Sequence, residues 1–258
     1  MKKIGIALGG GGARGVAHIG VLKTLEKAGI SPDHVVGVSM GSLIGAYYCL
    51  GFDLDYLEEE VCSLTKSKAI KKFLDLNNPK KSLIKGKKIE KYIDKINKES
   101  TFKDLKKPFK VVSTDLFTGE EVVLDEGNLT KALMSSISVP GIFPPVKLKG
   151  RYLVDGGVVN TTPVNVVEDM GADIIIGVDL VIQRGGEVSE PNIFSSLIQS
   201  YEVIRSQGAK SKLKDVNKKL IVIEPHLRET VDSFKFYDMR KFIRSGEIAA
   251  EKVLGDIL

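Results

Sequence analysis

Tryptophan is absent from this 258-residue chain, and aromatic residues together make up only 7% of it. Proteins that bind single-stranded nucleic acid stack the bases on aromatic side chains, so we expect no nucleic-acid partner. Only two cysteines are present, Cys49 and Cys62, too few for a disulfide framework in a chain of this length. We therefore expect a reducing, cytoplasmic environment.

Long apolar segments are missing as well. No apolar run reaches the roughly 18–20 residues that a membrane-spanning helix needs, so we expect the chain to meet a membrane only at its surface. The sequence also lacks a cluster of His, Cys, Asp and Glu at the spacing of metal ligands. We therefore expect neither a metal nor any other cofactor.

Positive charge is concentrated in one segment. Residues 66–110 carry 16 Lys, no Arg and five acidic residues, a net charge of +11, whereas the rest of the chain sums to −6. Such asymmetry is typical of a protein with an anionic partner, and peripheral contact with an anionic inner membrane surface would explain it. A solvated helical surface explains the same pattern equally well.

Short apolar runs alternate with segments of helical periodicity. Strands are expected at 3–8, 34–38, 109–115, 121–124, 152–154, 173–179 and 220–223, and helices at 13–28, 40–50, 129–137, 164–170, 193–213 and 238–258. This alternation predicts an α/β fold with three layers, α/β/α, and a largely parallel central sheet. We interpret the chain as a single domain, residues 1–258, with a Lys-rich helical cap or insertion at about 53–108.

A glycine-rich segment, Gly9-Gly10-Gly11-Gly12-Ala13-Arg14-Gly15, joins the first strand to the first helix. Without side chains, backbone N–H groups can crowd around a negative oxygen, and the helix adds the positive end of its dipole. A pyrophosphate and a tetrahedral oxyanion suit this loop equally well. However, a dinucleotide site needs an acidic residue at the end of the second strand, where this chain has Ser39, and no G-x-x-x-x-G-K-[ST] pattern is present.

A possible nucleophile follows the second strand. Gly37-Val38-Ser39-Met40-Gly41 matches the pattern G-x-S-x-G at a strand-to-helix junction, where flanking glycines allow a sharp turn that presents the serine hydroxyl. The Met40 N–H is then a natural oxyanion donor. The alternative is that Ser39 only caps the helix that follows.

A serine nucleophile needs a base, and the sequence offers two kinds. Asp155, followed by Gly156-Gly157, comes just past a strand, and a carboxylate in a dry pocket gains basicity and can take the serine proton directly. The histidines are His18, His34 and His226, and of these His226 follows the last core strand, as the order Ser…Asp…His would require.

Together these motifs resemble the patatin-like phospholipases, specifically their small single-domain bacterial members. The resemblance rests on the loop at 9–15, the elbow at 37–41 and Asp155-Gly156-Gly157, in that order, with 113–119 and 136–145 also similar to the family pattern. It covers about residues 4–180. Residues 52–108 and 185–258 carry no recognised motif, so they give no indication of the substrate.

The resemblance implies a Ser–Asp dyad that hydrolyses a lipid or another ester. Ser39 would attack the ester carbonyl, Asp155 would accept its proton, and N–H groups of Gly10, Gly11 and Gly12 would stabilise the oxyanion. Arg14 would brace the glycine loop or bind a lipid phosphate, unless it is a surface arginine of the first helical turn.

Two other functions fit the same residues. An acyltransferase would form the same acyl-enzyme but pass the acyl group to an alcohol or a thiol. A phosphate-binding module would use the glycine loop for the anion and Ser39 only as a helix cap. A regulatory scaffold without activity is disfavoured because all three motifs are intact.

Overall fold

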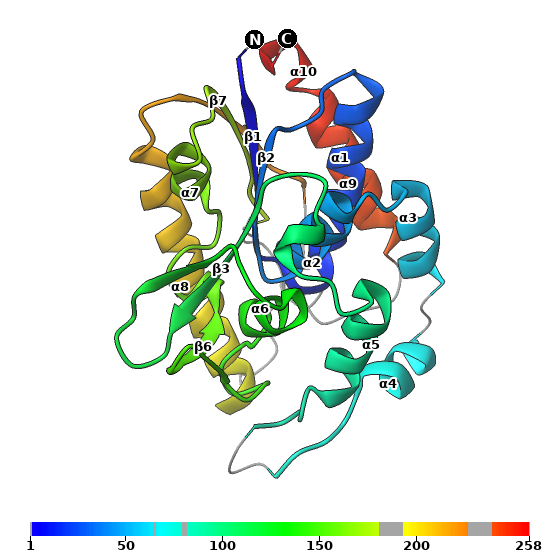
Figure 1. Cartoon of the computed structure of the whole chain (residues 1–258), viewed down its shortest axis with the longest axis vertical. Helices are drawn as coiled ribbons and strands as arrows, with labels where there is room; N and C mark the ends of the chain where they lie inside the picture. The colour runs from blue at the N-terminus through cyan, green and yellow to red at the C-terminus, as the bar shows by residue number, and fades with distance from the viewer. Residues whose placement is uncertain (1, 64–65, 79–81, 181–192, 227–238, 258) are drawn as a thin grey trace.

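The computed structural model describes residues 2–63, 66–78, 82–180, 193–226 and 239–257. Within these ranges eight strands form one sheet, with helices on both of its faces (Figure 1). The predicted three-layer α/β/α fold is therefore confirmed.

The elements follow the chain in the order that the sequence predicts, with a few additions. The strands are β1 (Ile4–Leu8), β2 (His34–Val38), β3 (Phe109–Asp115), β4 (Glu121–Leu124), β5 (Val146–Leu148), β6 (Arg151–Asp155), β7 (Ile174–Val178) and β8 (Lys219–Ile223). The α-helices are α1 (Ala17–Lys27), α2 (Met40–Leu50), α3 (Leu54–Cys62), α4 (Lys66–Phe73), α5 (Lys87–Asn97), α6 (Leu129–Ser136), α7 (Val164–Asp169), α8 (Ile193–Lys214), α9 (Arg240–Glu251) and α10 (Leu254–Ile257). Short 3-10 helices are η1 (Gly12–Val16), η2 (Phe102–Asp104) and η3 (Gly156–Val158).

The sheet is parallel through its centre and antiparallel at one side. Its order is β5-β6-β3-β2-β1-β7-β8, with β4 also paired to β3. The pairs from β3 through β8 along this order are parallel, whereas β4 and β6 run antiparallel to β3, and β5 runs antiparallel to β6. The expected largely parallel sheet is thus a mixed sheet, and the short strand β5 is an addition to the prediction.

Apolar residues on both faces of the central strands explain why the sheet is covered twice. In β1, Ile6 and Leu8 belong to the core cluster that contains α1, α2 and α9 side chains, whereas Ala7 belongs to the cluster with α7. A strand that is buried on both faces has no polar alternation, because each face packs against helices. This explains the continuous apolar runs in the sequence.

The pairing around β3 brings two strand ends together. β2 runs parallel to β3 as far as the pair Val38–Val112, and β6 runs antiparallel to it as far as the pair Asp155–Ser113. Because β4 pairs with both Val112 and Ser113 along the other edge of β3, β2 and β6 must share one edge. Their carboxyl ends therefore meet head-on, with Ser39 just beyond one and Asp155 at the other.

The Lys-rich segment forms helices that lie to one side of this sheet. α3 packs against α1 and α9, α5 packs against α6, and α4 packs against α5. Figure 1 shows α4 and α5 projecting on the opposite side of the molecule from the two chain ends. None of the helices in the described ranges combines the length and the apolar character needed to cross a bilayer.

Candidate active site

Ser39 lies at the turn between β2 and α2 in a strained backbone conformation. Its φ of 53° and ψ of −124° are rarely adopted by residues other than glycine. The turn also requires its flanking glycines: a Cβ on Gly37 would lie 2.6 Å from the Gly41 carbonyl oxygen, and one on Gly41 would collide with the Leu8 carbonyl oxygen. The residues of the G-x-S-x-G pattern are therefore needed for backbone geometry.

A second serine holds this turn in place. The Ser136 hydroxyl accepts a hydrogen bond from the Ser39 N–H at 2.9 Å and donates one to the Val112 carbonyl oxygen at 2.6 Å. Both contacts are buried. Ser136 thus links the elbow to β3, a role that the sequence did not predict although Ser136 lies in one of the family-like segments.

Asp155 is buried, with only 2% of its surface exposed. Its backbone N–H donates to the Ser138 carbonyl at 2.9 Å, and its Oδ1 accepts from the Gly157 N–H at 2.7 Å. Burial raises the pKa of the Asp155 carboxyl, while the Arg205 guanidinium, the Ser39 hydroxyl and the Gly157 N–H partly offset that rise. The Ser39 hydroxyl therefore faces a carboxylate of increased basicity.

The glycine loop passes beside this pair. A Cβ on Gly10 would lie 3.3 Å from the Ser39 Cβ, but the Gly10 N–H donates to the Thr161 carbonyl at 3.0 Å and so is already engaged. In the described part of the chain no acceptor is found for the N–H groups of Gly11, Gly12 and Met40. Gly12 and Met40 each begin a helix, where the N–H groups have no acceptor within the helix.

Two buried side chains, Arg14 and His18, contact carbonyl oxygens of the glycine loop. Arg14 is 1% exposed, and its Nε donates to the Gly11 carbonyl at 3.2 Å, so the interpretation of Arg14 as a surface residue is wrong. His18 Nε2 lies 2.7 Å from the Gly9 carbonyl oxygen. Burial lowers the pKa of His18 to about 4, so its imidazole is neutral and donates this bond.

The other two histidines lie away from Ser39. His34 is the first residue of β2, at the opposite end of the strand from Ser39. His226 follows β8, is exposed, and accepts a hydrogen bond from the Ser245 hydroxyl on its carbonyl at 3.1 Å. β8 is three strands away from β2, which corresponds to about 14 Å at the usual strand spacing.

Helix α8 contributes three site residues that the sequence did not indicate. Tyr201, Glu202 and Arg205 bring a buried hydroxyl, a carboxylate and a guanidinium next to Asp155 and the glycine loop. Arg205 follows Tyr201 by four residues and Glu202 by three, spacings that bring side chains together on a helix surface, and Arg205 is unusual in a chain whose basic residues are mostly Lys. Both signals are weak without the fold.

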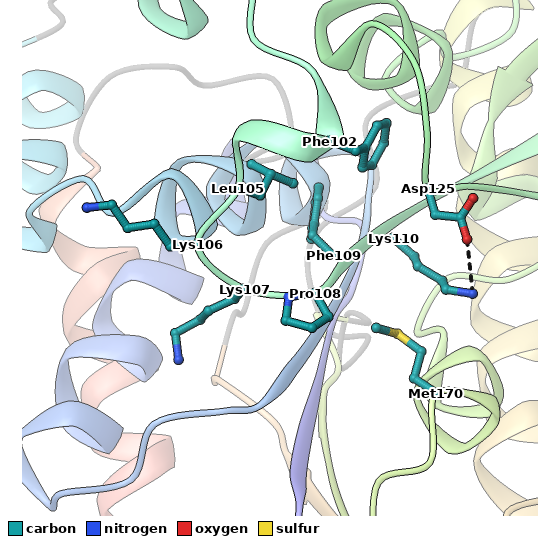
Figure 2. A pocket seen from close by; sticks show the side chains of 9 residues that line it. All are labelled: Phe102, Leu105, Lys106, Lys107, Pro108, Phe109, Lys110, Asp125 and Met170. Carbon is teal, nitrogen blue, oxygen red and sulfur yellow. Dashed lines mark ion pairs between the residues drawn. The ribbon is translucent and has the colours of Figure 1, made fainter.

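A surface hollow of about 400 Å³ lies elsewhere, at the beginning of β3 (Figure 2). Its lining includes Phe102, Phe109 and Lys107, together with the ion pair between Lys110 and Asp125 at 3.3 Å. None of the lining residues is Ser, Cys or His. The hollow is at the opposite end of β3 from Ser113, so it is separate from the Ser39–Asp155 pair.

No group of three or more His, Cys, Asp or Glu side chains in the described ranges is placed to hold a metal ion. The groups gathered at the site are the Ser39 hydroxyl, the Asp155 carboxylate, backbone N–H groups and the Arg205 and Tyr201 side chains. This combination suits acyl transfer through a covalent intermediate.

The chain is similar in sequence to known proteins. The family model described as patatin-like phospholipase matches residues 6–167. The patatin-like phospholipase domain-containing protein 6 of Mus musculus is 30% identical over 93% of this chain and 19% of its own length. An uncharacterised NTE family protein of Mycobacterium bovis is 32% identical over 80% of this chain and 57% of its own length.

A solved structure gives the same result for the fold. VipD from Legionella pneumophila superimposes with a TM-score of 0.54 and 15% identity, covering 99% of this chain and 67% of VipD. The chain spans about a fifth of the mouse relative and little more than half of the mycobacterial one. With the match to residues 6–167 and the agreement in fold, the chain belongs to the patatin-like phospholipase family.

Proposed function

We propose that this protein is a serine lipid acyl hydrolase of the phospholipase, lysophospholipase or esterase type. Membership of the patatin-like phospholipase family supports lipid acyl hydrolysis. The observation that carries the proposal is the meeting of β2 and β6 on one edge of β3, because it places the strained Ser39 beside the buried carboxylate of Asp155.

In the proposed mechanism Ser39 attacks the ester carbonyl while Asp155 accepts the hydroxyl proton. The protonated Asp155 then returns this proton to the leaving alcohol. In the second step the same carboxylate accepts a proton from the water that attacks the acyl-enzyme and returns it to the Ser39 oxygen. The increased basicity that burial gives to Asp155 favours the first step.

The oxyanion donors are revised from the expectation drawn from the resemblance. Because the Gly10 N–H is bonded to Thr161, we assign the oxyanion to the N–H groups of Gly11, Gly12 and Met40. Gly10 then keeps the loop close to Ser39, and Arg14 holds it through the Gly11 carbonyl.

Covalent labelling by a fluorophosphonate tests this function. The wild-type protein and the surface variant Ser63→Ala should be labelled, whereas Ser39→Ala should be neither labelled nor active while it remains folded. A phosphate-binding module whose Ser39 is only a helix cap would not react in any of the three. Addition of an alcohol acceptor would distinguish hydrolysis from acyl transfer by the products formed.

We also propose that residues 53–108 form a cap that docks on an anionic lipid surface. Leu74, Leu76 and Leu83 are 37%, 70% and 39% exposed, and Leu76 pairs with Ile84 in a short antiparallel bridge. The same segment carries exposed lysines: Lys71, Lys85, Lys87, Lys88 and Lys91. We call the exposed leucines Leu74, Leu76 and Leu83 the apolar tip. An apolar tip within a basic surface complements an anionic bilayer.

The position of this tip relative to the site supports the same idea. The Ile84 N–H donates to the Ile142 carbonyl at 2.9 Å, and residue 142 belongs to the loop that follows Ser136 and Ser138, which hold the backbones of Ser39 and Asp155. A lipid bound at the tip would therefore lie on the side of the molecule where the acyl ester is needed.

Vesicle sedimentation tests the docking. Binding to vesicles with anionic lipid should exceed binding to neutral vesicles and should weaken with salt. Leu83→Ser should reduce it, whereas Ile248→Ser, at a position on α9 of matched exposure (40%), should not. Equal binding to both kinds of vesicle at low salt would show that the lysines are only a solvated surface.

A further inference from the structure

Three polar groups converge on the place where Gly157 lacks a side chain. A Cβ at this position would lie 2.8 Å from Arg205 Nε, 2.9 Å from Asp155 Oδ1 and 3.3 Å from the Tyr201 hydroxyl oxygen. The guanidinium and the phenol of α8 are therefore only a few ångströms from the carboxylate. Glycine is needed here because any side chain would stand between Arg205 and Asp155.

The same guanidinium reaches the nucleophile on its other side. A Cβ on Gly10 would lie 2.8 Å from Arg205 Nη2 and 3.3 Å from the Ser39 Cβ. Arg205 thus extends from the glycine loop beside Ser39 to the carboxylate of Asp155. Gly10 and Gly157, which are distant in sequence, leave the space that the Arg205 guanidinium occupies.

Arg205 is buried with incomplete hydrogen bonding. It is 6% exposed, and its Nη1 donates to Glu202 at 3.0 Å. In the described ranges Arg205 Nε and the Tyr201 hydroxyl make no hydrogen bond of good geometry, although both lie close to the Asp155 carboxylate. A buried polar atom without a hydrogen bond destabilises a fold, so its presence beside Asp155 suggests that it serves a function.

We propose that Arg205, assisted by Tyr201, is a positioning residue that keeps Asp155 ionised and directed at Ser39 inside a dry site. This inference rests on the proposed role of Asp155 as the base. The fixed positive charge favours the carboxylate over the carboxylic acid, and the Arg205 guanidinium is held in place by Glu202, which also binds Arg14 Nη2 at 3.3 Å.

The charges around Asp155 support this assignment. Arg205 and Tyr201 face it from α8, the Ser39 hydroxyl from the elbow and the Gly157 N–H from η3. Burial raises the pKa of Asp155, and among the groups that oppose the rise Arg205 has the largest effect. Glu202, Tyr201, Asp155 and Asp179 in turn keep Arg205 protonated, holding its pKa above the ordinary value although burial opposes this.

The pH dependence of kcat/KM tests the proposal. Arg205→Gln removes the charge, so the acid limb of the profile should move to higher pH by about 1–3 units, the range for loss of an opposite charge at this separation. Arg205→Lys keeps the charge and should leave the limb close to its wild-type position. Tyr201→Phe removes a hydroxyl that favours the ionised form of Asp155 and should also move the limb to higher pH.

Arg14→Met is the matched control, because it removes another buried guanidinium of the same ion-pair network that is not among the groups acting on Asp155. Its rate can fall through the glycine loop, but its acid limb should stay in place. Folding of each variant is checked by circular dichroism. If Arg205→Gln fails to fold, Tyr201→Phe decides, because an acid limb that does not move in this variant overturns the proposal.

Failure of this inference is distinguishable from failure of the dyad. If Asp155→Asn retains activity, Asp155 is not the base and the proposed function itself is wrong. If Asp155→Asn is inactive but the folded Arg205→Gln and Tyr201→Phe variants keep the wild-type acid limb, the dyad stands and Arg205 has only a structural role.

Discussion

Replacing Asp155 by Asn separates a Ser–Asp dyad from a triad that uses a histidine. Asn is nearly isosteric, and its amide oxygen can still accept the Gly157 N–H that Asp155 Oδ1 accepts at 2.7 Å. The substitution therefore removes the proposed base and leaves the turn intact. We expect kcat to fall by about 10²–10⁴-fold, the usual contribution of general-base catalysis.

The structure also fixes the expected pH dependence. Because burial raises the pKa of Asp155, wild-type activity should fall on the acid side at a pH above the ordinary carboxyl value of 3.8. Activity requires the ionised form, so the loss occurs as the pH drops through the raised pKa. A chromogenic ester measured from pH 4 to 9 gives this profile, and Asp155→Asn should lose its acid limb.

The free energy of unfolding of Asp155→Asn should rise at neutral pH, although its activity falls. A folded-state pKa above the unfolded value means that the protonated carboxyl favours folding, and this contribution is lost as the pH rises through the folded pKa. At neutral pH the uncharged Asn should therefore make the protein more stable than the wild type. The advantage should vanish below the unfolded pKa, and thermal unfolding at several pH values measures it.

Histidine variants complete the test. His226→Gln and His34→Gln should keep most of the activity. His18→Gln should lower stability because the Gly9 carbonyl loses its 2.7 Å partner, yet each folded molecule, counted by fluorophosphonate titration, should remain active. If His226→Gln were folded but as inactive as Ser39→Ala, the dyad would be refuted.

Two further substitutions probe the parts that surround the pair. Gly11→Val should lower turnover by about 10²–10³-fold with little change in KM, the effect of losing an oxyanion donor. A Cβ at Gly11 would lie 2.7 Å from Leu180 Cδ1, so the loop or the Leu180 side chain must shift. Gly255→Ala is the control, because the space around Gly255 is open. A change in KM alone would mark the loop as a ground-state binding site. Ser136→Ala leaves the buried Ser39 N–H unpaired and should cost about 1–3 kcal/mol of unfolding free energy as well as activity, measured by denaturant titration and ester hydrolysis. Ser138→Ala, which removes only a hydroxyl bond to the Met134 carbonyl, should be milder; equal losses in the two variants would contradict the special role of Ser136.

Local patterns in the sequence determined the elements and the turns. The strands β1, β2 and β7 follow from continuous apolar runs, because a strand buried on both faces has no room for polar residues. The turn at Ser39 follows from its two glycines, since only glycine permits the close backbone approaches observed there. The buried strands and the turn each depend on a few consecutive residues, so the sequence alone is enough to predict them.

The tertiary structure decided which residues meet. That Asp155 faces Ser39 depends on β2 and β6 sharing one edge of β3, a choice of register and direction that no local pattern encodes. The same holds for Arg205, whose helix carries no recognisable motif, and for the Gly10 N–H, which is taken by Thr161 from a distant loop. Long-range pairing follows from packing of the whole chain, so the sequence could supply the candidates for this site but not their contacts.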